Sequence, residues 1–224
     1  MTNNVKRKQI KEEKMKNNYA KKVFYSTLGV ILISLAVSLF RMADIGTDPF
    51  SCFNLGIANL TGISFGDAQL STNIILTLIL IYPGFKHFGF GTLLAMVGVG
   101  YISDFILYIF PFDASTQNMI IRILIVCAGI LVTSTGIAMY SCTKFGISQY
   151  DAMSFILCEK SNGKIKLQYA RIAVDLILIL GGYLMGSVVG IGTVLIALAV
   201  GPVVSYLIPN VFNPIMNRDE KKAQ

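Results

Sequence analysis

The amino-acid sequence predicts an all-α polytopic membrane protein, and three observations support that class. Of the 224 residues, 54% are hydrophobic and only 14% are charged, whereas soluble domains carry about 25% charged residues. Apolar runs of roughly 20 residues, the length of a helix that crosses a ~30 Å hydrocarbon layer, recur along the chain. The third observation is an internal repeat with a spacing of about 100 residues. Together they predict six transmembrane helices in two related halves.

We expect the transmembrane helices at residues 23–41, 67–83, 89–110, 119–141, 167–186 and 190–209. Two further segments of helical spacing, 49–60 and 149–159, are too short to cross the bilayer. The chain then divides into a basic tail (1–22), a first repeat (23–112), a second repeat (119–210) and a C-terminal tail (211–224). Each half therefore holds three transmembrane helices and one short helix.

The repeat is carried by glycines and by the residues that follow them. At an offset of 100, Gly46 corresponds to Gly146 and Phe50 to Tyr150; at an offset of 101, Gly62 corresponds to Gly163. The same offset of 101 superimposes two Gly-x-Gly-Thr motifs, each followed by seven residues and a further glycine. Because small residues let helices approach closely, we expect helix packing at these motifs. They comprise Gly91, Thr92 and Gly100 in the first half and Gly192, Thr193 and Gly201 in the second.

Basic residues indicate how the two halves are oriented. Eight of the nineteen Lys and Arg residues lie in the first 22 positions, and with three spans per half Lys86, Lys144 and Lys160 fall on the same side as that tail. This distribution follows the positive-inside rule, so we expect both termini in the cytoplasm and the protein in a bacterial cell membrane. An odd number of spans per half inserts the second half upside down, as an inverted-topology repeat. The net charge of +7 then indicates contact with anionic lipids rather than with nucleic acid.

Each half contains a polar break that begins with glycine and leads into the short helix. Asp48 followed by Pro49 is a strong helix start, and Ser148 precedes Asp151 by three residues, the spacing of a capping box. Two placements of the short helices are compatible with the sequence. They are re-entrant, with N-termini aimed at a solute near the midplane, or they lie flat in the interface and close each half structurally.

Polar and ionisable residues within the apolar sequence are the candidate solute- or ion-binding residues, because an unpaired charge is costly there. They are Asp48, Ser51, Asn54 and Asn73 in the first half, and Ser148, Asp151, Ser154, Arg171 and Asp175 in the second. Arg171 and Asp175 are spaced i to i+4 on one helix face, and the pair either couples transport to protons or only fixes helix register. Asp104 is expected to pair with Arg41 or Arg122.

Motifs of enzymes and metal sites are nearly absent from the sequence. It has no HExxH and no GKS/T motif. Gly62-Ile-Ser-Phe-Gly66 fits G-x-S-x-G but lacks the strand–turn–helix setting that a nucleophile elbow needs. The four cysteines form no CxxC pair. We therefore expect no enzyme activity, no cofactor and no bound metal.

The two glycine-led breaks and the paired Gly-x-Gly-Thr spans resemble the YczE/YyaS/YitT-type bacterial membrane proteins over residues 23–210. Gly46-x-x-Pro49-Phe50-Ser51 is similar to the Gly-x-x-Pro-aromatic-polar element of that family, and Gln149 stands where the second copy would have proline. The family is largely without assigned biochemistry. The resemblance therefore implies a fold and a membrane location and leaves the substrate open.

Two functions are compatible with these features. The first is a secondary transporter or permease for a small polar or cationic solute, with its site between the two halves and proton coupling through Asp175. The second is a non-transporting membrane regulator that binds another membrane protein through its basic tail and small-residue faces. Either function is compatible with a homo-oligomer.

Overall fold

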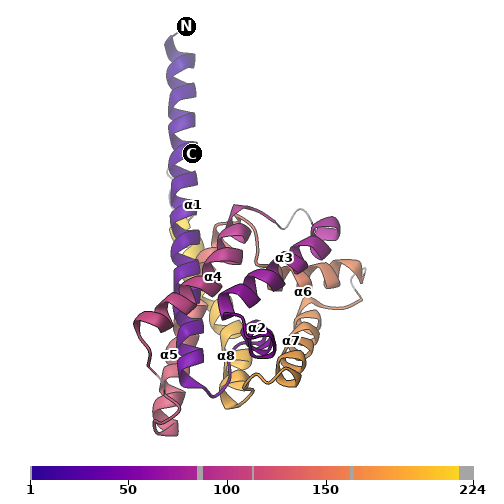
Figure 1. Ribbon diagram of the computed structural model, residues 1–224. Coiled ribbons are helices and arrows are strands. Elements are labelled where there is room, and N and C mark those ends of the chain that lie inside the picture. Colours follow the sequence, from indigo (N-terminus) through magenta and orange to yellow (C-terminus); the bar gives the residue numbers. More distant parts are fainter. Residues whose placement is uncertain (1, 85–87, 113, 162–163, 217–224) are drawn as a thin grey trace.

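The computed structural model describes residues 2–84, 88–112, 114–161 and 164–216, and within them all regular structure is helical (Figure 1). Lys86 and Gly163, which entered the charge and repeat arguments, and residues 217–224 of the C-terminal tail lie outside the described residues. Six helices are long and apolar enough to cross a membrane, so the predicted class of an all-α chain with six such helices is confirmed. These helices are α1 (Thr2–Ala43), α3 (Phe65–Gly84), α4 (Phe90–Ile109), α5 (Met119–Cys142), α7 (Leu167–Leu184) and α8 (Ile191–Leu207).

The ends of the long helices differ from the predicted ends at two places. Helix α1 begins at Thr2 rather than near residue 23, so the expected basic tail is helical, and Figure 1 shows it projecting beyond the bundle. Helix α8 continues into a short π-helix, η2 (Ile208–Phe212), and the apolar segment as a whole runs from Ile191 to Met216. The expected start of α1 was placed where the apolar run begins, although no proline or glycine interrupts residues 2–22 and the helix continues through them.

Two short helices, α2 (Pro49–Thr61) and α6 (Gln149–Lys160), follow the polar breaks. Asp48 caps α2 by accepting the N–H of Ser51 at 3.0 Å, and the Ser148 hydroxyl caps α6 by accepting the N–H of Asp151 at 3.1 Å. At 1.5 Å per residue both helices are about 18–20 Å long, which is shorter than a ~30 Å hydrocarbon layer. Neither belongs to the six candidate spans.

Helices α1 and α5 pack along each other. They approach closely at Gly29 and Gly136, where a Cβ atom on either glycine would lie 2.8 Å from the carbonyl oxygen of the other. Helix α4 packs on α1, and α8 packs on α5. Around the remaining side α2 packs on α3 and α7, and α6 packs on the same two helices. The four helices α2, α3, α6 and α7 therefore form a second cluster beside the α1–α5 pair.

Each Gly-x-Gly-Thr motif docks on the break of the other half. The Gly91 N–H donates to the Phe145 carbonyl at 2.9 Å, and the Gly192 N–H donates to the Ile45 carbonyl at 2.8 Å. The next residue of each break, Gly46 or Gly146, has a positive φ of 108° or 118°, and its backbone lies against Thr193 or Thr92 respectively. A side chain at either break glycine would strain the backbone and collide with the docked motif.

The later glycines of the two motifs differ in their surroundings. A Cβ atom at Gly100 would lie 2.8 Å from the Cα atom of Gly66, so α3 and α4 approach closely there. A Cβ atom at Gly201 would meet no atom within 4 Å. Within the described chain Gly201 therefore makes no approach that requires glycine. Helix α3 also packs on α4 extensively, whereas α7 makes few contacts with α8.

Candidate functional site

The first turns of the two short helices meet in the interior of the second cluster. The rings of Phe50 and Tyr150 stack, with centroids 5.6 Å apart and planes at 19°. Phe50 packs with Val174 and Leu178 of α7 in one buried apolar group. Because these aromatic residues open α2 and α6, their contact brings together polar residues that are about 100 positions apart in the sequence.

Tyr150 is linked to three charged side chains of α6 and α7, those of Asp151, Arg171 and Asp175. The Arg171 guanidinium lies 4.7 Å from the ring centroid and its Nη1 is 2.6 Å from the Asp151 carboxylate. The Tyr150 hydroxyl donates to Asp175 at 2.5 Å. The expected ion pair of Arg171 with Asp175 was therefore wrong, because each of the two residues has another partner. Helix α6 packs against α7, so these partners lie on α6. An ion pair spaced i to i+4 within one helix contributes only about 0.2–0.5 kcal/mol, which does not outweigh them.

Two amide side chains hold α3 to its neighbours. Asn73 donates to the Met96 carbonyl of α4 at 3.3 Å, so its amide faces α4 rather than the ring pair. Gln149, which sequence reasoning treated only as a substitute for proline, is buried and donates to the Thr77 hydroxyl at 3.1 Å. Gln149 therefore links α6 to α3. A long amide at the first position of a buried helix was the only signal that could have identified it.

Buried oxygen atoms without a hydrogen-bond partner lie in the same part of α2 and α6. Asn54 is 0% exposed and Ser154 is 2% exposed. The Asn54 amide nitrogen donates to the Phe50 carbonyl at 2.8 Å, but the Asn54 Oδ1 and the Ser154 hydroxyl oxygen have no partner among the residues that the structure describes. Asp48 accepts the Ser51 N–H through one carboxylate oxygen, and its other oxygen is also unpartnered. Ser51 itself is buried beside this carboxylate.

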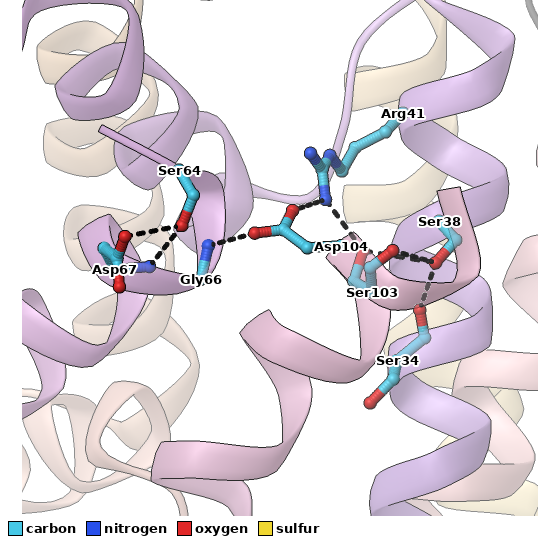
Figure 2. A network of polar contacts seen from close by, with 8 residues as sticks. All are labelled: Ser34, Ser38, Arg41, Ser64, Gly66, Asp67, Ser103 and Asp104. Atoms are coloured by element: carbon cyan, nitrogen blue, oxygen red, sulfur yellow. Dashed lines mark hydrogen bonds and ion pairs between the residues drawn. The ribbon is translucent and has the colours of Figure 1, made fainter. Parts of the chain in front are cut away.

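A second polar network joins α1, α3 and α4 (Figure 2). The Asp104 carboxylate accepts from Arg41 at 2.7 Å and from the Gly66 N–H at the start of α3 at 2.7 Å. Arg41 also donates to the Ser103 hydroxyl at 3.0 Å. Of the two partners predicted for Asp104, the structure selects Arg41; Arg122 instead lies near Asp44, with an N–O distance of 3.5 Å. This network fixes the first turn of α3 to α4.

The described residues contain no group of three or more His, Cys, Asp or Glu side chains placed to hold a metal ion. What they contain is a bundle of six long apolar helices whose interior holds charged residues, a combination that defines a polytopic α-helical membrane protein.

The family model described as "Family of unknown function (DUF6198)" matches residues 20–209, so the chain belongs to that family. It is similar to an uncharacterised protein of Haemophilus influenzae, at 26% identity over 190 residues that cover 82% of this chain and 84% of that protein. It is also similar to two proteins of Bacillus subtilis. The uncharacterised protein YyaS is 24% identical over 88% of this chain and 94% of its own length.

The uncharacterised membrane protein YczE is 24% identical over 81% of this chain and 82% of its own length. The resemblance to YczE- and YyaS-like proteins is thereby confirmed. No solved structure matches the chain.

Proposed function

We propose that this protein is a secondary transporter of a small polar or cationic solute, with its site between two inverted halves. The observation that carries the proposal is the cluster of ionisable side chains buried where the first turns of α2 and α6 meet. Ionisable groups inside a membrane protein are costly and mark solute or ion pathways. A site formed by the equivalent helices of two repeats is the arrangement typical of inverted-repeat transporters.

Matched backbone conformations support the inverted repeat. The cap residues Asp48 and Ser148 have φ and ψ of −63° and 156° and of −66° and 154°. Asp44 and Lys144, at equivalent positions, share φ values of 50° and 54°. The docking of each Gly-x-Gly-Thr motif on the opposite break is reciprocal, as expected for two copies related by a two-fold axis. With three spans per half, such an axis lies in the membrane plane.

The burial gradient along the short helices supports the re-entrant placement. In α2 the first six residues are buried or nearly so, whereas Leu60 near its end is 71% exposed. In α6 Gln149 is buried and Lys160 is exposed. A helix lying flat in an interface would expose one face along its whole length. A gradient from end to end instead suits a helix that enters the membrane with its N-terminus innermost.

The unequal packing of equivalent helices supports alternating access. Helix α3 packs on α4, and the Asp104 network fastens its first turn, whereas the equivalent pair α7 and α8 makes few contacts. If α7 packed on α8 while α3 separated from α4, the halves would exchange their arrangements. The solute site would then open to the other side of the membrane. With both termini in the cytoplasm of a bacterial cell, as the positive-inside rule favours, the fastened side is the outer one.

Solute flux into liposomes tests this proposal. Purified protein is reconstituted, and currents or tracer uptake are measured for amines, amino acids, amides and inorganic cations. We expect flux that Asp175→Asn abolishes or uncouples from a proton gradient, while Asp67→Asn, at an exposed acid outside the site, retains it. Flux unchanged in Asp175→Asn would exclude proton coupling through this residue.

The same protein preparation also tests the alternative function. The absence of flux for every solute, together with stable co-purification of another membrane protein, would contradict transport and favour the regulator. On either function we propose a non-enzymatic protein without a cofactor, whose N-terminal basic residues contact anionic lipids.

A further inference from the structure

We propose that the solute site binds a monovalent cation that carries N–H donors, an ammonium group, rather than an anion or a neutral solute. This inference rests on the proposed function, because it assigns the chemical class of solute to the same site. It follows from the charge balance of the site, from its unpartnered oxygen atoms and from the occupancy of its helix N-termini.

The charge balance of the site is negative. The carboxylates of Asp48 and Asp151 both act electrostatically on Asp175, and Arg171 is the one described cation that acts on it. Arg171 forms its ion pair with Asp151, and Asp175 accepts from a neutral phenol. Among the described residues Asp48 accepts from neutral donors at the start of its own helix, the N–H and the side chain of Ser51 among them, and forms no ion pair. Since uncompensated charge is costly in a low-dielectric interior, a bound cation would stabilise this arrangement.

Three of the buried side-chain oxygens that lack a partner among the described residues lie at the start of α2 or within α2 and α6. They are Oδ1 of Asp48, Oδ1 of Asn54 and the hydroxyl oxygen of Ser154. Ser154 lies one turn after Tyr150 and Asp151 on the same face of α6, and Asn54 lies one turn after Phe50 on α2. Both residues are therefore one helical turn away from the stacked rings. A buried acceptor without a donor costs about 1–3 kcal/mol. A ligand with several N–H donors would satisfy these acceptors together.

A capping side chain already occupies one N–H at each of the two helix N-termini of the site. A helix N-terminus normally binds anions through its first N–H groups. In this protein Asp48 already accepts the Ser51 N–H and the Ser148 hydroxyl accepts the Asp151 N–H. The cap of α2 is itself a carboxylate, so its negative charge repels an incoming anion where the helix dipole would otherwise attract it. The carboxylate cap therefore disfavours the anion-binding use of the first break, which the sequence left open.

An alkali ion shares the positive charge but not the hydrogen-bond donors, and a quaternary amine shares the charge but has no N–H. Thermal stability of the purified protein therefore separates these ligands. Melting is followed in detergent at constant ionic strength with the chloride salts of methylammonium, ethylammonium, tetramethylammonium, sodium and potassium, and with sodium acetate as the anion arm. We expect methylammonium or ethylammonium to raise the melting temperature, with little effect of the other salts.

The matched variants are Asp48→Asn and Asp67→Asn. Asparagine is as good an N-cap as aspartate, so Asp48→Asn removes the charge and keeps the cap of α2. We expect it to weaken the apparent affinity for alkylammonium at least tenfold, while Asp67→Asn leaves that affinity unchanged. Equal stabilisation by acetate, equal stabilisation by tetramethylammonium and sodium, or an unchanged affinity in a folded Asp48→Asn protein would each overturn the proposal.

Flux measurements separate this inference from the proposed function. Alkylammonium binding without flux of any solute would retain the cation site and contradict transport. Flux of an anion or a neutral solute without alkylammonium binding would retain transport and overturn the cation site.

Discussion

Replacing Asp104 by asparagine tests whether the network between α1, α3 and α4 stabilises the fold. Asp104 accepts two short hydrogen bonds, from the Arg41 guanidinium and from the Gly66 N–H, each at 2.7 Å. Asparagine keeps one acceptor and presents an NH₂ group to the other donor. One charge-assisted hydrogen bond, a contribution of about 1.5–3 kcal/mol when buried, is therefore lost.

The expected magnitude is set by the burial of the pair. The side chains of Arg41 and Asp104 are 16% and 26% exposed. Solvent therefore relieves part of the cost of leaving the Arg41 guanidinium unpaired in the variant. The guanidinium also keeps its contact with the Phe65 ring, whose centroid lies 4.3 Å away. We expect a loss of about 2 kcal/mol. At ~2–4 °C per kcal/mol for a chain of this size, the melting temperature falls by about 4–8 °C.

The assay follows from the composition of the chain. The protein has no tryptophan but four cysteines. Cys52 is buried and forms no disulfide, so its thiol becomes reactive when the protein unfolds. A thiol-reactive fluorogenic dye therefore reports unfolding in detergent. Asp67→Asn is the comparison, because Asp67 lies in the same region and is exposed; its carboxylate accepts from the neutral hydroxyls of Ser64 and Tyr101, so we expect a smaller loss than in Asp104→Asn. A double variant, Arg41→Gln with Asp104→Asn, is expected to lose less than the sum of the single losses. An Asp104→Asn protein that melts with the wild type would refute the reasoning.

Three further predictions use the same melting assay. Gly146→Ala is expected to lose about 1–3 kcal/mol of stability from backbone strain alone, because the φ of Gly146 is 118°. Gly201→Ala, with open space around the Cβ position, is expected to melt like the wild type. Equal effects of the two substitutions would contradict the docking of the breaks. Phe50→Ala is expected to lose about 3 kcal/mol through the cavity it leaves beside Tyr150 and α7; no change would show that the two first turns do not pack. Gln149→Leu removes the hydrogen bond to Thr77 and is expected to lose about 1 kcal/mol, and a stabilised variant would show that this bond contributes nothing.

The parts of the fold that depend on local sequence were predictable. Span length and apolarity predicted the six long helices, and Asp48-Pro49 predicted the start of α2 at the residue where it begins. The pairing of Asp104 with a basic residue was predictable from its position within an apolar helix, because an unpaired charge is costly there and few basic residues are close enough to pair with it. Partners across helices were not predictable. Arg171 pairs with Asp151 instead of Asp175 because α6 lies against α7, and no periodicity within one helix contains that fact.

The repeated glycines acquire their meaning only when the two halves are seen together. Gly91 and Gly192 were expected to bring long helices close to each other, but each donates its N–H to the break of the opposite half. The break glycines, Gly46 and Gly146, adopt positive φ where the opposite motif covers them. Each half therefore holds the other's short helix at its first turn, where the buried polar groups lie. Movement of one half against the other would therefore change the position of both first turns at once, and the transport function that we propose requires such a coupled movement.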